Sequence, residues 1–200
     1  MNRTAGRGAV FLDRDGTLIE EVGYLDRPER LELYPWTVGA IQALNRVGLV
    51  TVLVSNQSGV ARGFFTEAVV DVVHGQLADR LGEGGARLDA YYYCPHHPDG
   101  RVAEYARACA CRKPGRGLVD RAVEEFGIDP QRSFTVGDRW LDIALARTIG
   151  AKGILVRTGY GLSEERRPPD GLSADAVADN LAGAASWILG QLTQENLVVG

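Results

Sequence analysis

Cysteine is scarce in this sequence, and its few copies lie close together. The chain has 200 residues but three cysteines, at positions 94, 109 and 111. Three cysteines cannot all pair within one chain, and a reducing compartment favours thiolates over disulfides. We therefore expect free sulfur ligands rather than a disulfide framework.

Long apolar runs are absent too. No run approaches the roughly 20 residues that a membrane-spanning helix needs. Residues 1–8 contain two arginines but no apolar stretch of signal-peptide length. These two absences predict a cytoplasmic protein that does not bind a membrane.

Basic charge is not in excess either. The 22 lysines and arginines are outnumbered by 26 aspartates and glutamates, which gives a formal net charge of −4. Nucleic-acid-binding domains usually carry a basic surplus. We expect no nucleic-acid partner, although a local basic pocket is compatible with this composition.

Apolar runs and amphipathic segments alternate along the chain. The pattern predicts strands at 10–12, 49–54, 88–93, 133–136 and 153–156. It predicts helices at 36–47, 66–81, 117–126, 140–149 and about 174–192. Such alternation is typical of an α/β fold with a doubly wound parallel sheet. We expect one domain over residues 1–200, with its core at about 9–160, no cap domain, and a monomer.

Polar side chains follow three of these predicted strands. Asp13 and Asp15 follow the first, residues 55–58 follow the second, and Asp138 follows the fourth. Carboxyl ends of parallel strands meet at one edge of a sheet, where α/β proteins bind ligands. Two acids as close as Asp13 and Asp15 repel each other unless a cation lies between them. Their oxygen ligands suit a hard cation such as Mg²⁺. Each group alone could equally cap a turn or a helix.

The cysteines belong to a second constellation. Cys94 and His96 are followed by Cys109 and Cys111, a four-ligand set suited to structural zinc. Residues two apart in an extended chain point the same way, so His97 would point away from the other ligands. A closed four-ligand site has no position for water, so it would organise the loop over 94–112 rather than catalyse. Unrelated buried cysteines are the alternative.

Four short stretches together resemble the motifs of the haloacid dehalogenase-type phosphatases. They are FLDRDGT at 11–17, SNQS at 55–58, RKP at 112–114 and GD at 137–138, in the order typical of that family. The resemblance implies that Asp13 is the nucleophile, forming an aspartyl-phosphate, and that Asp15 is the acid and base. It also implies that Ser55 and Lys113 hold the phosphoryl group.

The same resemblance implies the catalytic metal ligands. Asp13 and Asp138 would bind Mg²⁺ through carboxylate oxygens, and Asp15 through its backbone carbonyl. Asp142, one helical turn beyond Asp138, would support the site without binding the ion.

The zinc loop narrows the resemblance further. Its length and its continuation into Arg112-Lys113-Pro114 are similar to the heptose-bisphosphate phosphatases. This implies a small phosphorylated sugar, D-glycero-D-manno-heptose 1,7-bisphosphate, that loses its 7-phosphate. The related histidinol-phosphate phosphatases, with a shorter loop, are the alternative.

The substrate contacts are also implied by this resemblance. Residues 21–24 match the family's substrate loop, which often has aspartate and histidine at its first two positions. The expected contacts are Glu21, Val22, Gly23, Tyr24, Ser55, Asn56, Gln57, Ser58, Arg112, Lys113 and Arg139, with Arg62 a further candidate for the second phosphate.

Two other classes of protein are weighed against a phosphatase. A phospho-accepting signalling domain would use Asp13 as a switch, but Asp15 and Lys113 together suit turnover. A zinc-knuckle nucleic-acid binder conflicts with the acidic net charge.

The zinc site generates the first testable prediction. The protein should retain about one equivalent of zinc when Mg²⁺ is removed, because four protein ligands enclose a structural ion. The substitution Cys109→Ser removes one thiolate and should cause loss of most of this zinc. Elemental analysis of the purified protein measures the content, and an unchanged value in the variant would contradict the ligand set.

Overall fold

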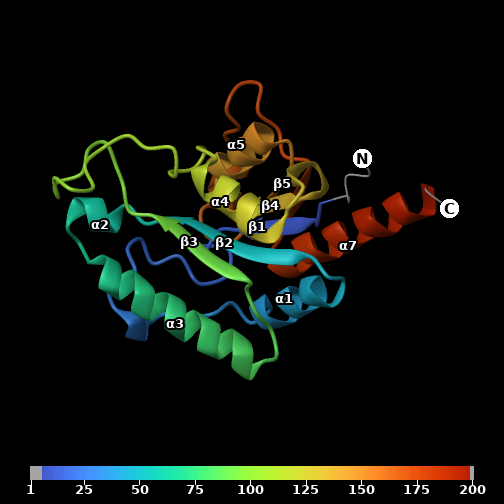
Figure 1. Ribbon diagram of the computed structural model, residues 1–200, viewed down its shortest axis with the longest axis horizontal. Helices are drawn as coiled ribbons and strands as arrows, with labels where there is room; N and C mark the ends of the chain where they lie inside the picture. The colour runs from blue at the N-terminus through green and yellow to red at the C-terminus, as the bar shows by residue number, and fades with distance from the viewer. Residues whose placement is uncertain (1–5, 199–200) are drawn as a thin grey trace.

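The strands form one parallel sheet. The computed structural model describes residues 6–198, of which 195–198 are described as backbone only. The sheet has six strands in the order β3-β2-β1-β4-β5-β6 (Figure 1). Their bounds are β1 Ala9–Leu12, β2 Val50–Asn56, β3 Ala90–Cys94, β4 Phe134–Gly137, β5 Lys152–Val156 and β6 Ala176–Ala178. The chain winds outward from β1 to β3 and then returns to β4 on the other side of β1, so the strand order reverses at the β1/β4 pair.

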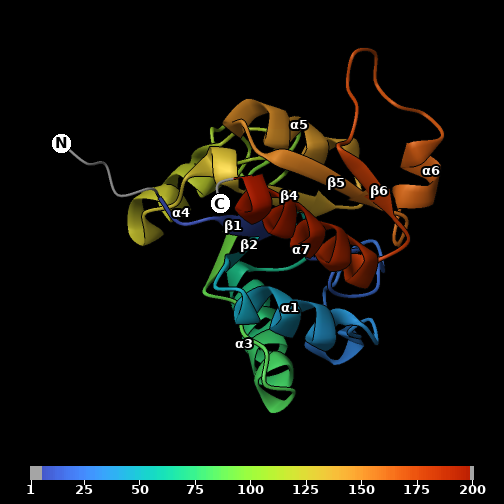
Figure 2. The same cartoon turned by 90° about the vertical axis from the view of Figure 1, so that its right-hand side faces the viewer.

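Helices cover both faces of the sheet. Figures 1 and 2 show three long helices on one face: α1 Thr37–Arg46, α3 Glu67–Glu83 and α7 Leu181–Val198. The opposite face carries α4 Gly117–Phe126 and α5 Trp140–Ile149. The remaining short pieces are α2 Gly59–Arg62, α6 Gly161–Glu165 and the 3₁₀ turns η1 Pro28–Arg30 and η2 Pro130–Arg132. The result is the predicted doubly wound α/β architecture.

Strand β1 shows why its sequence is continuously apolar. Side chains alternate between the two faces of a strand. Val10 and Leu12 pack in the core beneath α1, α3 and α7, whereas Ala9 and Phe11 pack in the core beneath α4 and α5. Because both faces are covered by helices, all four side chains are buried.

Several predicted boundaries are confirmed and others move slightly. Helices α4 and α5 have the predicted bounds. Strand β2 continues through residues 55 and 56, and β3 ends on residue 94, so those polar residues belong to the strand ends rather than to loops. Within residues 6–198 no separate domain is inserted between the strands, and no helix has both the length and the apolarity needed to cross a membrane.

The prediction for residues 174–192 is wrong at its start. Alanine is abundant there and favours a helix, but Ala176–Ala178 form the edge strand β6. The nitrogen of Asp175 donates to the oxygen of Gly153 at 2.8 Å, which draws this segment onto β5. Asn180 then accepts a hydrogen bond from the nitrogen of Gly183 at 3.1 Å, as an N-cap residue does. Helix α7 therefore begins only at Leu181.

The core generates a stability prediction. Leu53, on the central strand β2, is fully buried, so Leu53→Ala should lower the free energy of unfolding by about 2–5 kcal/mol. Val47→Ala is the control, because Val47 is 50% exposed and should change stability by about 0.5 kcal/mol or less. Urea denaturation measures both. Equal effects of the two substitutions would contradict the assignment of Leu53 to the core.

Candidate active site

The carboxyl ends of the central strands open into a cleft of about 320 Å³. Thirteen sequence-predicted residues line it: Asp13, Asp15, Glu21, Gly23, Tyr24, Ser55, Asn56, Gln57, Ser58, Arg62, Arg112, Lys113 and Arg139. Asp138 lies beneath this lining and is 1% exposed. Val22 does not line the cleft, because its side chain packs against the hydrophobic core. The prediction of a substrate contact by Val22 is therefore not met by this arrangement.

A buried lysine joins two carboxylates at the bottom of the cleft. Lys113 Nζ lies 2.8 Å from Asp13 Oδ1 and 2.7 Å from Asp142 Oδ1. Burial by itself would lower the pKa of Lys113, but the charges of Asp13 and Asp142 outweigh it and raise the pKa above its ordinary value. The lysine is therefore a fixed positive charge. Burial also raises the pKa of Asp142 to about 6, even with Lys113 beside it.

The backbone of Lys113 is held as well as its side chain. Asn56, the last residue of β2, accepts from the nitrogen of Lys113 at 2.9 Å and donates to its oxygen at 3.2 Å. This pair of hydrogen bonds attaches the segment after the cysteine loop to the end of a sheet strand. Asn56 was predicted as a substrate contact, and the structure places it on the cleft wall with this positioning role.

Asp138 presents a buried oxygen that lacks a partner. Its Oδ2 accepts from the nitrogen of Tyr160 at 2.7 Å, while its Oδ1 is buried and has no hydrogen-bond partner among the described residues. Burial, followed by the charge of Asp13, raises the pKa of Asp138 to about 8. A buried acceptor of this kind is costly unless a proton or a cation satisfies it.

Glycine makes room for this carboxylate. Gly16 has a φ of +76°, and a Cβ built on either Gly16 or Gly159 would lie 2.2 Å from Asp138 Oδ2. The oxygen of Gly16 accepts a hydrogen bond from Thr158 at 2.5 Å, which holds the two glycine turns together. Tyr160 and its neighbours were not identified from the sequence, although a glycine-rich turn directly after a strand is a signal that could have indicated them.

These carboxylates fit a divalent cation. One oxygen each of Asp13, Asp138 and Asp142 lies within 4.8 Å of the others. Both oxygens of Asp142 are engaged, Oδ1 by Lys113 and Oδ2 by the nitrogen of Arg139. Asp13 pairs with Lys113 through Oδ1, and Asp138 Oδ1 has no partner among the described residues, so Asp13 and Asp138 offer the open ligands. Hard oxygen donors and an uncompensated charge suit Mg²⁺.

Asp15 is held by hydrogen bonds at the cleft wall. Arg14 donates to it from Nε at 3.1 Å and from a terminal nitrogen at 3.0 Å. Gln57 donates to it at 2.9 Å and to Ser55 Oγ at 2.8 Å. Arg14 was not identified from the sequence, because an arginine between two acids is normally expected to face solvent.

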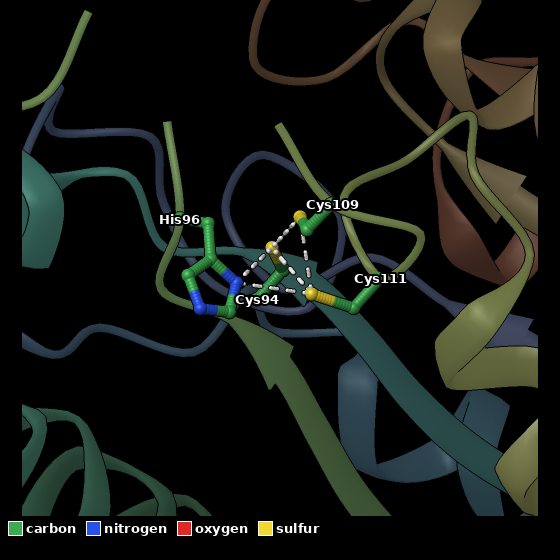
Figure 3. A group of neighbouring side chains, drawn as sticks. All are labelled: Cys94, His96, Cys109 and Cys111. Atoms are coloured by element: carbon green, nitrogen blue, oxygen red, sulfur yellow. Dashed lines mark hydrogen bonds between the residues drawn. The ribbon is translucent and has the colours of Figure 1, made fainter. Parts of the chain in front are cut away.

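The four predicted zinc ligands converge. Figure 3 shows Cys94, His96, Cys109 and Cys111 turned toward one another, with the imidazole Nδ1 facing the sulfurs. All four ligand atoms lie within 4.8 Å of one another, and Cys94 Sγ is 3.0 Å from Cys111 Sγ and 3.6 Å from His96 Nδ1. Zinc binds sulfur at about 2.3 Å in a tetrahedral site, so these donors are close enough to share one ion. Burial raises the pKa of the Cys94 thiol, which a bound cation would reverse.

His97 lies outside this cluster, as predicted, and lines the cleft. Its Nε2 is 3.2 Å from a terminal nitrogen of Arg62. Arg62 and Arg112 both line the same cleft, and the guanidinium of Arg139 lies 3.8 Å from the ring centroid of Tyr160. Three half-buried arginines therefore line the cleft, together with the more deeply buried Asp13 and Lys113.

The predicted substrate loop, residues 21–24, is held by an internal hydrogen bond and by an aromatic contact. Glu21 accepts from the nitrogen of Gly23 at 2.5 Å, and burial raises the pKa of Glu21. The ring of Tyr24 packs edge-on against Phe64, with centroids 4.6 Å apart. The loop thus places one carboxylate and one aromatic ring at the rim of the cleft.

A doubly wound sheet with this set of groups at its switch point defines a phosphatase of the haloacid dehalogenase type. Residues 110–184 match the family described as "HAD-hyrolase-like". The D-glycero-D-manno-heptose-1,7-bisphosphate 7-phosphatase of Thermosynechococcus vestitus is 43% identical over 91% of this chain and 95% of its own. The D-glycero-beta-D-manno-heptose-1,7-bisphosphate 7-phosphatase of Escherichia coli K12 is 38% identical over 92% of this chain and 89% of its own.

A solved structure agrees with these relatives. The D,D-heptose 1,7-bisphosphate phosphatase of B. bronchiseptica, complexed with magnesium and phosphate, has a TM-score of 0.82 and 31% identity, covering 92% of this chain and 99% of that one. The chain belongs to the family of D-glycero-D-manno-heptose-1,7-bisphosphate 7-phosphatases.

The buried carboxyl generates a prediction about magnesium binding. Because the pKa of Asp138 is raised to about 8, this group holds a proton in the free protein at pH 7 and must release it when a cation binds. Magnesium affinity should therefore rise with pH until about pH 8, with about one proton released per ion at pH 7 and far less at pH 9. Calorimetric titration in buffers of different ionisation enthalpy counts these protons. Equal proton release at both pH values would contradict the assignment.

Proposed function

We propose that this protein hydrolyses the 7-phosphate of D-glycero-D-manno-heptose 1,7-bisphosphate in a Mg²⁺-dependent reaction through an aspartyl-phosphate on Asp13. The observation that carries the proposal is the Asp13–Lys113–Asp142 arrangement, at 2.8 and 2.7 Å, at a cleft that Arg62, Arg112 and Arg139 also line. The names of the relatives supply the substrate, since they act on this bisphosphate.

Asp13 is the nucleophile in this proposal. Its Oδ1 faces Lys113 Nζ, and its backbone nitrogen donates to Val136 at 2.9 Å, so the side chain is fixed at the end of β1. Asp13 forms a bond to phosphorus as the bond from phosphorus to the sugar oxygen breaks. Ser55 and the backbone amides that follow it hold the phosphoryl oxygens, as donors at the start of a helix can.

Asp15 moves the protons. It donates a proton to the departing sugar oxygen in the first step. In the second step it takes a proton from the water that attacks phosphorus, and the bond from phosphorus to Asp13 breaks. Phosphate leaves and both carboxyl groups return to their starting states. Asp15 lines the cleft beside Asp13, as this role requires.

Charge is the main barrier to this chemistry, because a carboxylate must approach an anionic phosphate. Lys113 supplies one fixed positive charge. Asp13, Asp138 and the backbone carbonyl of Asp15 would hold Mg²⁺, which, when bound, neutralises further negative charge on the phosphoryl group. Zinc held by the four-ligand cluster would fix the loop that ends two residues before Lys113.

The second phosphate of the substrate would lie at the mouth of the cleft. Arg62, Arg112 and Arg139 all line it. Guanidinium groups suit phosphate because their donors match its oxygens in pairs. A monophosphate would leave these charges unpaired, which favours a bisphosphate.

The experiment compares phosphate release from heptose 1,7-bisphosphate and from histidinol phosphate in the presence of Mg²⁺. We expect the bisphosphate to be preferred by at least about 10²-fold in kcat/KM, since a site that pairs buried or clustered charges discriminates strongly against a ligand that lacks them. Asp13→Asn is the matched inactive control, because the amide is nearly isosteric but cannot form the covalent intermediate.

Two results would contradict the proposal. Preference for histidinol phosphate would keep the mechanism and replace the substrate. Undiminished turnover by folded Asp13→Asn would remove Asp13 from the mechanism.

A further inference from the structure

Arg14 is a buried charge whose role the proposed reaction does not yet explain. Its side chain is 1% exposed, although it lies between two acids in the first motif. A buried guanidinium is costly unless its donors are satisfied. Arg14 directs them to three neighbours: Asp15, Gln57 and His74.

Arg14, Gln57 and Asp15 close a ring of hydrogen bonds. Arg14 donates to Gln57 Oε1 at 2.9 Å, and Gln57 Nε2 donates to Asp15 Oδ2 at 2.9 Å. Arg14 itself donates to both carboxylate oxygens of Asp15. Donors from two directions fix the plane of the Asp15 carboxyl, which a single hydrogen bond would leave free to rotate.

The ring also distinguishes the two oxygens of Asp15. Oδ2 accepts from Arg14 Nε and from Gln57, whereas Oδ1 accepts one hydrogen bond, from Arg14. A carboxylate oxygen has two lone pairs in its plane. The remaining lone pair is therefore on Oδ1, and the Asp15 side chain is 20% exposed at the cleft.

His74 supports Arg14 from behind. It lies on α3, and its Nε2 is 3.4 Å from a terminal nitrogen of Arg14. Burial, followed by the charge of Arg14, lowers the pKa of His74 to about 3, so the ring is neutral and Nε2 can accept. Its ring centroid is 5.7 Å from that of Tyr91 and 5.6 Å from that of Tyr93, so aromatic packing on β3 fixes its orientation.

We propose that Arg14 is a positioning residue that, supported by Gln57 and His74, holds the Asp15 carboxyl with Oδ1 directed for proton transfer to the leaving oxygen. This inference rests on the proposed function, in which Asp15 protonates that oxygen. Arg14 does not contact the reacting atoms, and its contribution is to keep the proton donor in one orientation.

The dependence on the leaving group tests this role. An alkyl ester such as a hexose 6-phosphate needs a proton on its departing oxygen, whereas 4-nitrophenyl phosphate releases a stable anion without one. We expect Arg14→Met to lower kcat/KM, which reports the transfer of the phosphoryl group to Asp13, by about 10²-fold on the alkyl ester and by less than about threefold on the nitrophenyl ester, since general acid catalysis typically contributes 10²–10⁴-fold. The hydrolysis of the aspartyl-phosphate is common to both esters and does not enter kcat/KM. Substrate affinity should change little, because the Arg14 side chain is 1% exposed.

A double-mutant comparison tests whether Arg14 affects the rate through Asp15. If Arg14 acts through Asp15, then Arg14→Met combined with Asp15→Asn should be no slower on the alkyl ester than Asp15→Asn alone, within about threefold. Arg147→Met is the matched control, because Arg147 is exposed on α5 and pairs with Asp175 at 3.6 Å, away from the cleft. It should change neither rate.

The outcomes separate the two proposals. Equal losses in kcat/KM on both esters for Arg14→Met, or losses that add to those of Asp15→Asn, would overturn the positioning role alone. An Asp15→Asn variant that hydrolyses the alkyl ester at the native rate would overturn the role of Asp15 in the proposed function.

Two variants of His74 test the proposal if Arg14→Met does not fold. Circular dichroism and zinc content show whether a variant is folded. His74→Leu removes the acceptor behind Arg14 and should slow the alkyl ester selectively, whereas His74→Gln supplies an amide oxygen in its place and should restore the rate. Loss of the same size in both variants would overturn the proposal.

Discussion

The attraction between Lys113 and two buried carboxylates is the interaction on which the site depends. Asp13, Asp138 and Asp142 bring up to three negative charges into one small volume, and Lys113 balances one of them. Two negative charges remain, which is the charge that one divalent ion would neutralise. Burial, followed by the charge of Asp13, raises the pKa of Asp138, so a proton on Asp138 removes one of these negative charges when no cation is bound. The balance of charge at the site therefore depends on Lys113 and on the carboxylates of Asp13, Asp138 and Asp142 together.

Two features of the structure hold the backbone near Lys113 in place. The amide of Asn56 holds its backbone from the end of β2, and Cys111 precedes it by two residues in the four-ligand cluster. Lys113 itself does not lie on a regular element, since residues 95–116 lie between β3 and α4 without a long helix or strand. The loop closed by the four converging cysteine and histidine side chains, together with the end of β2, therefore does for Lys113 what a strand end does for Asp13.

Sequence reasoning located elements and residues whose signal is local. Helices α4 and α5 were predicted to the residue because an amphipathic pattern stops at Gly127 and Gly150, which both adopt positive φ. Spacing predicted the convergence of Cys94, His96, Cys109 and Cys111, which the structure shows. The positions of Asp13 and Asp15 after a predicted strand, and the resemblance to known motifs, pointed to the cleft that they line with Lys113. The orientation of the Val22 side chain could not be predicted from its place in the sequence. Its neighbours Glu21 and Gly23 line the cleft, whereas Val22 itself packs against the core. The burial of Arg14 and the edge strand β6 depend on partners distant in the chain, namely His74 and β5.

The position of β1 at the centre of the sheet has a consequence for how the chain is made. One edge of β1 pairs with β2, but the other pairs with β4, where Val10 lies opposite Phe134. At the usual rate of synthesis, about 5–20 residues per second, β4 follows β1 from the ribosome after about 6–25 seconds. During that interval a wholly apolar strand has one unpaired edge, which is the kind of surface that promotes aggregation. Strand β1, which leads directly into Asp13, is thus the first strand made but gains its second partner only with the fourth.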